Sequence, residues 1–166
     1  LSKITLINKN QTGYVTDKLP QNFMNIGLIN AAMPEAKIIR IKRNKNDNIL
    51  SIYQQRFTGG INYAFSQKNI KNYFSQYEQM MKKWEDIYQR NIYEIEYEEI
   101  TNNFDVVINK LFNWLDIEFT NKEIKFFENN NNVKTTSKTQ VREPLNTKSH
   151  NKWMNYQKYL PELFKY

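Results

Sequence analysis

The fold is decided by residues 37–56, which read KIIRIKRNKNDNILSIYQQR. The first part of this stretch is rich in β-branched residues and predicts a strand over 37–41. The second part places Ile49, Ile52 and Tyr53 on one face and predicts a helix over 46–56. A strand that runs through a short basic turn into an amphipathic helix is the repeating unit of α/β domains with a parallel sheet.

The same alternation of strands and helices continues on both sides of this stretch. Further strands are expected over 13–17 and 91–97, and further helices over 22–33, 67–89 and 100–115. This order predicts an α/β fold with a parallel sheet, right-handed crossovers and helices on both faces. Ligands of such sheets bind at the carboxyl ends of the strands.

The C-terminal part departs from this pattern. Residues 129–152 form a polar stretch without periodicity, and an aromatic helix is expected over 152–159. A stretch of this length without regular structure is uncommon inside a compact domain and is usually a functional loop or disordered. No linker or repeat is visible, so we expect one domain over 1–166 that contains the loop 129–152.

The composition excludes several kinds of site. The 166 residues include no Cys and a single His, His150, which excludes disulfides, thiolate centres and multi-histidine metal sites. No apolar run approaches the ~18 residues of a membrane-spanning helix, and no membrane partner is expected. The formal net charge of +7 favours anionic partners, although a basic surface without a specific partner is an equal alternative.

Functional side chains are expected where the predicted strands end. Lys18 follows the first strand, Arg43 the second and Tyr97 the third. Because the carboxyl ends of parallel strands meet at one edge, Lys18 and Arg43 predict a cationic rim over a helix N-terminus that suits phosphate or sulfate. Ser51 can share that anion with Arg43 if the turn folds back. The alternative is that Arg43 belongs to a solvated charge run, that Ser51 is a packed hydroxyl and that Tyr97 belongs to the core.

Several segments then carry a family resemblance. They are DKLPQNF at 17–23, PEAKII at 34–39, RNKNDNILSIY at 43–53, YEEI at 97–100, SKTQVREPL at 137–145, and Ser149 with Lys152-Trp153. In this order they resemble the sulfotransferase family, and most of all bacterial sulfotransferase domains fused to tetratricopeptide repeats, which are relatives of protein tyrosine sulfotransferases. The resemblance covers nearly the whole chain and implies a P-loop-like sulfotransferase fold.

The resemblance implies a reaction and its partners. A sulfuryl group would pass from 3′-phosphoadenosine 5′-phosphosulfate (PAPS) to a hydroxyl of a protein tyrosine, a sugar or a small alcohol, leaving 3′-phosphoadenosine 5′-phosphate (PAP). Such transfer needs in-line positioning and cations where negative charge develops, without a metal. It further implies tetratricopeptide repeats upstream in a full-length chain, and a cytoplasmic location if the source is bacterial.

The resemblance also assigns roles to residues. Arg43 and Ser51 match the pair that binds the 3′-phosphate, and Lys18 matches the lysine that stabilises the transferring group and the bridging oxygen. Ser137 matches a second transition-state contact, and Lys152 matches a basic residue that reaches a nucleotide phosphate. The other nucleotide-lining positions are Tyr97, Gln140, Val141 and Arg142.

Two parts of the family pattern are not found. The glycine-rich loop for the 5′-phosphosulfate is missing, and the residue two after Lys18 is Pro20 instead of the His of cytosolic small-molecule sulfotransferases. His150 is expected to be an exposed loop residue, not a replacement base. We therefore expect this chain, which starts at Leu1, to be the C-terminal two-thirds of the domain and to be inactive alone.

Other functions are compatible with the sequence. A kinase would share the fold but needs the motif GxxxxGK[ST], which is absent here. A nucleic-acid-binding module would use the positive charge and the aromatic residues, but the cations do not cluster on one predicted face, so no nucleic acid partner is expected. A degenerate sulfotransferase fold that only binds its ligand is the third alternative.

Overall fold

A computed structural model describes residues 14–55, 57, 60–118 and 145–165. In these residues a two-stranded sheet is formed by β1 (Ile38–Lys42) and β2 (Ile92–Glu96). The strands are parallel, with Ile38 opposite Ile92 and Lys42 opposite Glu96. The predicted α/β class with a parallel sheet is confirmed, and both strands lie where the sequence places them.

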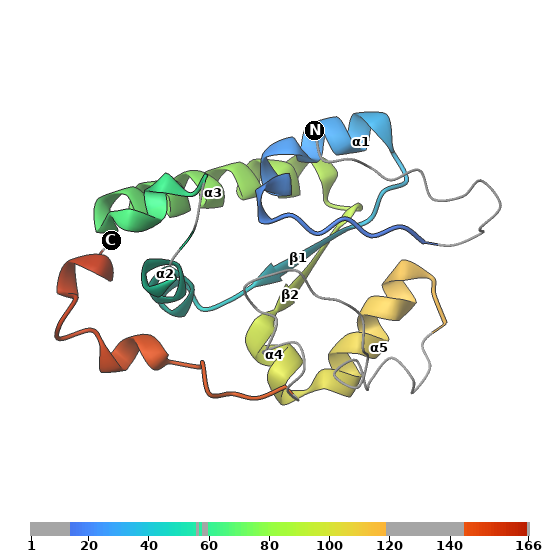
Figure 1. Cartoon of the computed structure of the whole chain (residues 1–166). Helices are drawn as coiled ribbons and strands as arrows, with labels where there is room; N and C mark the ends of the chain where they lie inside the picture. The colour runs from blue at the N-terminus through green and yellow to red at the C-terminus, as the bar shows by residue number, and fades with distance from the viewer. Residues whose placement is uncertain (1–13, 56, 58–59, 119–144, 166) are drawn as a thin grey trace.

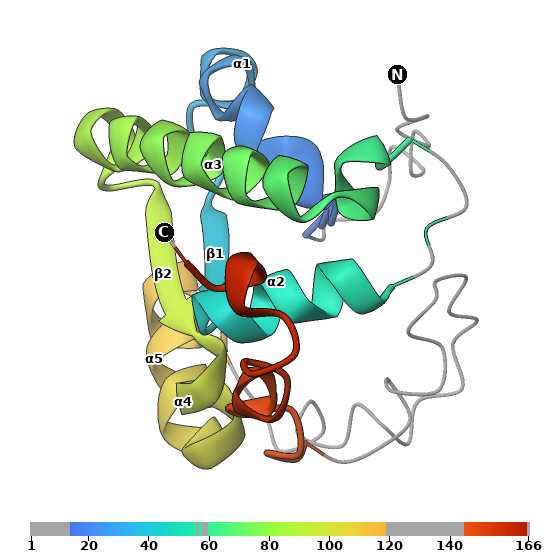
Figure 2. The ribbon, with the colours of Figure 1, turned by 90° about the vertical axis from the view of Figure 1, so that its left-hand side faces the viewer.

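The helices surround this sheet. Their bounds are α1 (Ile26–Ala32), α2 (Lys45–Gln54), α3 (Gln67–Tyr88), α4 (Tyr97–Asn102) and α5 (Phe104–Leu115), with short 3-10 helices η1 (Pro20–Asn25), η2 (Asn62–Phe65), η5 (Lys152–Asn155) and η6 (Pro161–Leu163). Figures 1 and 2 show α1 and α3 on one side of the sheet and α4 and α5 on the other. The predicted helices on both faces are therefore present.

Local chemistry fixes where the two helices between the strands begin. The side chain of Asn44 accepts hydrogen bonds from the backbone N–H groups of Asn46 (3.0 Å) and Asp47 (3.2 Å) at the start of α2. Ser66 caps α3 in the same way by accepting from the N–H of Asn69. These caps satisfy N–H groups that have no partner inside their own helix.

Buried apolar side chains form two clusters. One joins α2, α3 and η6 and contains Ile49, Ile70, Phe74 and Leu163. The other joins β2 to α5 and contains Ile95, Val107 and Leu111. Figure 2 shows the C-terminal segment, in red, lying against α2. Because Leu163 is fully buried, this segment is part of the core although a long stretch of chain precedes it.

The two faces of the sheet differ in polarity. Arg40 of β1 donates to Tyr77 of α3 from its Nε (3.0 Å), so the face towards α3 carries charged side chains. On the opposite face Ile95 packs in the cluster with α5. Ile39 and Ile41 of β1 lie on that second face but stay 43% and 57% exposed, because α5 packs against β2.

Four predicted elements differ from the structure. The helix predicted over 22–33 is the 3-10 helix η1 followed by α1. Residues 14–17 form no strand and are exposed; a strand needs a partner for its backbone groups, and no described strand pairs with this segment. The helix predicted over 100–115 is two helices, α4 and α5, separated at Asn103. The helix predicted over 152–159 is reduced to η5, because a segment this short depends on tertiary contacts for its conformation.

The loop predicted over 129–152 lies mostly outside the described residues. Its described end, residues 145–151, contains no helix or strand. The extent of the domain stays a prediction.

Candidate functional site

The candidate site lies at the carboxyl ends of the two parallel strands. Arg43 follows β1, and Tyr97 begins α4 directly after β2. The guanidinium carbon of Arg43 lies 5.4 Å from the centroid of the Tyr97 ring, and its Nη2 donates to the carbonyl oxygen of Ser149 (3.3 Å). Strand ends far apart in the sequence therefore meet, as expected for a parallel sheet.

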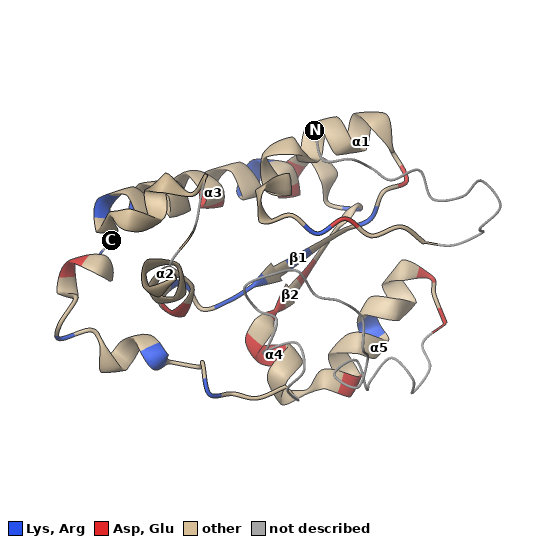
Figure 3. Cartoon of the chain, viewed as in Figure 1, with Lys and Arg blue, Asp and Glu red and all other residues tan. Residues whose placement is uncertain are grey.

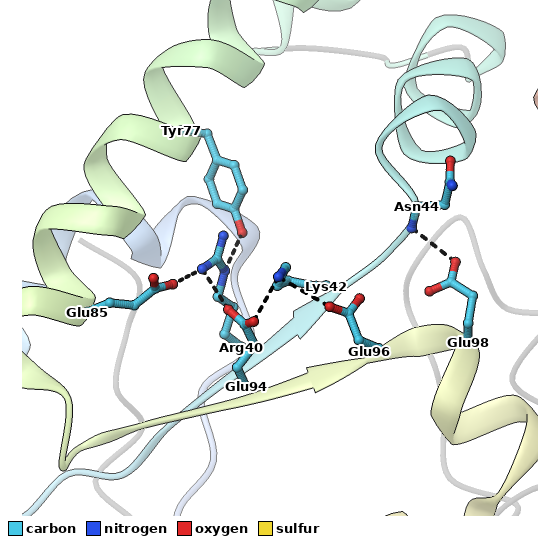
Figure 4. A network of polar contacts seen from close by, with 8 residues as sticks. All are labelled: Arg40, Lys42, Asn44, Tyr77, Glu85, Glu94, Glu96 and Glu98. Carbon is cyan, nitrogen blue, oxygen red and sulfur yellow. Dashed lines mark hydrogen bonds and ion pairs between the residues drawn. The ribbon is translucent and has the colours of Figure 1, made fainter.

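Arg43 differs from the other cations of its charge run. Arg40 contacts Glu85 and Glu94, Lys42 contacts Glu94 (2.8 Å) and Glu96 (3.2 Å), and Lys45 contacts Glu78 (2.8 Å). Figure 4 shows the first two of these cations with their carboxylates. Arg43 has no carboxylate partner among the described residues. Three cations of the run thus form ion pairs with carboxylates of the protein, whereas Arg43 does not.

The ionic contacts of Lys42 keep it out of the site. The hydrogen bond to Glu94 raises the pKa of Lys42 above its usual value, against a smaller opposing effect of burial, and Glu96 adds to the rise. The ammonium group is therefore charged and already engaged by two carboxylates of the neighbouring strand (Figure 4). Its charge compensates the carboxylates of Glu94 and Glu96 on β2 and is not directed at a ligand.

One donor of Arg43 is buried without a partner. Its Nε has no hydrogen-bond acceptor among the described residues, although the atom is shielded from solvent. An unsatisfied buried N–H is unfavourable and uncommon in folded proteins. The planar guanidinium fork is the side chain best suited to phosphate or sulfate oxygens, so an anion would satisfy this donor.

His150 joins the cluster from the C-terminal segment. Its ring meets the Tyr97 ring edge-on at 6.0 Å, and its Nε2 lies 2.9 Å from the hydroxyl of Thr101. The hydroxyl of Thr101 also lies 2.9 Å from the carbonyl oxygen of Glu98, and which group donates in the contact with His150 depends on the tautomer of the imidazole ring. His150 is half-buried. The expectation of an exposed loop His was wrong, because this segment packs against α4.

Protein groups cap two N–H groups at the N-terminus of α2. The N–H of Asn44 donates to Glu98 Oε1 (3.0 Å; Figure 4), and the Asn44 side chain accepts from Asn46 and Asp47. The N–H of Asn48 donates to the carbonyl of Asn44 (2.9 Å). Asn44 thus caps two N–H groups of the first turn of α2, and the rim of Lys18 and Arg43 over this helix N-terminus stays a prediction.

The remaining predicted residues are placed in different ways. Lys18, Ser51 and Lys152 are exposed, and their side chains make no hydrogen bond or ion pair with another described residue. The structure shows no contact of Arg43 with any of these three within the described ranges. The other predicted site residues lie outside the described residues; they are Ser137, Gln140, Val141 and Arg142.

One buried residue of the site was missed by the sequence analysis. Asp47 is 2% exposed and contacts the backbone of the C-terminal segment through both oxygens. The sequence does carry a signal for it: Asp47 stands three positions before Leu50, and so on the same helical face as that buried residue. A carboxylate on an apolar helical face indicates a specific buried partner.

Neither a metal-binding cluster nor a membrane-spanning helix is found in the described part of the chain. There, no group of three or more His, Asp or Glu side chains is placed to hold a metal ion. Likewise, no described helix is both long and apolar enough to span a bilayer. Figure 3 shows Lys and Arg distributed over many elements, together with acidic residues.

Comparison with known proteins identifies the family. Residues 3–121 match a model of the sulfotransferase family. The chain is also 34% identical over 149 residues to an uncharacterized protein of Aquifex aeolicus (strain VF5). That alignment covers 88% of this chain but 20% of the relative, so the chain spans about a fifth of that protein's length. The resemblance to domains fused to tetratricopeptide repeats stays a prediction. With a family match over most of its length and a parallel α/β sheet, this chain belongs to the sulfotransferase family.

Proposed function

We propose that this chain forms the 3′-phosphate half of the donor site of a PAPS-dependent sulfotransferase. The observation that carries the proposal is the state of Arg43, which is fixed at the ends of both strands while its buried Nε has no partner. Family membership supports sulfuryl transfer as the reaction class. The nucleotide and the residue roles below are the proposal.

The described residues fit the proposed nucleotide. Arg43 would bind the 3′-phosphate through its unpaired Nε, while Tyr97 and the Ser149 carbonyl fix the orientation of the guanidinium. Ser51 and Lys152 carry an exposed hydroxyl and an exposed ammonium group, which we assign to the phosphates. On the resemblance alone, Gln140, Val141 and Arg142 would line the nucleotide.

PAPS, when bound, supplies a sulfuryl group activated by its link to phosphate. Transfer would form a bond between the acceptor hydroxyl oxygen and sulfur while the bond from sulfur to the bridging oxygen breaks in line; the leaving oxygen would keep the electron pair, and the hydroxyl proton would be released to solvent. We assign Lys18 to stabilise the charge that develops on that oxygen, since its ammonium group is exposed and unpaired among the described residues. Ser137 is proposed as a second contact to the same group.

Calorimetric titration of the protein with PAP tests the proposal, with AMP and ATP as controls. We expect PAP to bind at least about tenfold more tightly than AMP, since one further charge-assisted contact contributes about 1.5–3 kcal/mol. Equal affinities for PAP and AMP would contradict the 3′-phosphate site. Preference for ATP would instead support a kinase-like enzyme.

A further inference from the structure

The carboxylate of Asp47 connects two parts of the chain that are distant in sequence. Its Oδ2 accepts from the backbone N–H of Asn151 (2.7 Å), and its Oδ1 accepts from the N–H of Trp153 (2.9 Å). Asp47 lies in the first turn of α2, whereas Asn151 and Trp153 flank the start of η5. Both oxygens of one buried side chain are thus used to hold the C-terminal segment.

The charge of Asp47 is balanced by amide groups. No ion pair between Asp47 and a described Lys or Arg is present. The carboxylate instead lies at the positive end of α2 and accepts two N–H groups, an arrangement that favours negative charge. An apolar residue of similar size would leave the N–H groups of Asn151 and Trp153 without this acceptor. The carboxylate therefore indicates that hydrogen bonds, and not packing alone, fix the position of the C-terminal segment.

The held segment also carries contacts of the candidate site. Asn151 has a left-handed backbone (φ 53°, ψ 19°), which turns the chain between the site and η5. Directly before this turn, the Ser149 carbonyl accepts from Arg43 and the His150 ring lies against Tyr97. The segment is thus fixed to Asp47 at its C-terminal end and contacts Arg43 at its N-terminal end.

We propose that Asp47 is a positioning residue of the nucleotide site, an inference that rests on the proposed function. Asp47 holds residues 149–153 so that the Ser149 carbonyl accepts a hydrogen bond from Nη2 of Arg43. This bond leaves Nε of Arg43 directed at the 3′-phosphate. Without the two bonds to Asp47, the carbonyl leaves Arg43 and the guanidinium is no longer fixed. Asp47 itself touches neither donor nor acceptor.

The substitution Asp47→Asn tests this role, because it keeps the size of the side chain and replaces one acceptor oxygen by a donor. Asp105→Asn is the matched control: Asp105 also lies in the first turn of a helix, but it is exposed. We expect hydrogen exchange of the amides in 149–155 to rise at least about tenfold in Asp47→Asn. We expect PAP affinity to fall about tenfold, with AMP affinity unchanged.

A second pair of variants leaves Asp47 and the core intact. Asn151 is exposed, and its left-handed backbone is strained for Ala but not for Gly. Asn151→Ala should weaken PAP binding by roughly fivefold, whereas Asn151→Gly should bind PAP as the natural protein does. Because neither substitution changes Asp47, this pair tests whether the position of residues 149–153 controls PAP binding even if Asp47→Asn does not fold.

The outcomes separate the positioning role from the proposed function. Unchanged exchange in 149–155 overturns the role of Asp47 in holding the segment. Faster exchange with an unchanged ratio of PAP to AMP affinity leaves Asp47 a purely structural residue and overturns the positioning role. A natural protein without preference for PAP over AMP overturns the proposed function, whereas the exchange data still report on the contact between Asp47 and the segment.

Discussion

The guanidinium carbon of Arg43 lies 5.4 Å from the centre of the Tyr97 ring, and this contact joins the carboxyl end of β1 to that of β2. A cation placed over an aromatic face is held without losing its charge. The same guanidinium retains a buried donor without a partner. Arg43 is thus positioned by the fold and still able to bind an anion.

Arg43→Ala should remove the preference for a nucleotide that carries a 3′-phosphate. We expect PAP affinity to fall by about 1.5–3 kcal/mol, roughly tenfold to a hundredfold, with AMP affinity nearly unchanged. Calorimetry on the natural protein measures both affinities. Arg90→Ala, at an exposed arginine after α3, is the control. If Arg43→Ala kept the full preference for PAP, the 3′-phosphate assignment would be wrong.

Lys18→Ala should slow transfer without loosening the nucleotide. A cation that acts on charge developing at the leaving oxygen contributes mainly to the transition state, so we expect kcat to fall by about a hundredfold or more. The affinity for PAP should change less than about threefold. Steady-state assays of sulfuryl transfer provide kcat, with the exposed Lys82→Ala as control. An unchanged kcat would remove Lys18 from the mechanism.

Gly27→Ala should destabilise the protein although Ala favours helices. A Cβ at Gly27 would lie 3.0 Å from Cη2 and 3.3 Å from Cζ3 of Trp84. That ring is fixed because its Nε1 donates to the carbonyl of Phe23 (2.7 Å). We expect the free energy of unfolding to fall by about 1–3 kcal/mol in chemical denaturation. In a Trp84→Phe background the loss should be smaller, and an equal loss would show that the Trp84 ring is not its cause.

Tyr63 should make stability fall at alkaline pH. Burial raises the pKa of Tyr63 to about 12 from 10.0, and Tyr73, whose ring stacks on it (3.8 Å between centroids), adds to the rise through its charge and a hydrogen bond. A raised pKa means that the folded state favours the neutral phenol, so stability is complete below pH 10 and declines as the pH rises towards 12.

Tyr63→Phe tests this decline because it removes the titrating group. Denaturation midpoints at about pH 8 and about pH 11 should differ less in Tyr63→Phe than in the natural protein. Tyr159→Phe, at a tyrosine that is 69% exposed, should behave as the natural protein does. An identical alkaline decline in the natural protein and in Tyr63→Phe would assign the decline to other groups.

Local sequence patterns were sufficient for the elements that carry their own signal. The β-branched run of β1 and the amphipathic period of α3 predict those elements almost at their observed bounds. The segment 14–17 has a strand-like sequence but forms no strand, because strand formation needs a partner as well as propensity. Likewise, the helix predicted from propensity over 152–159 is only the short 3-10 helix η5.

By itself, the sequence determined that Arg43 and Tyr97 follow consecutive strands and would meet at one edge, because side-chain order along parallel strands is a property of the chain. It could not decide which cation of the charge run is left for a ligand. Three of the four are neutralised by carboxylates on β2 and α3, 33 or more positions away along the chain. Only the tertiary structure brings those carboxylates close, since Coulomb energy depends on distance in space and not on separation in sequence.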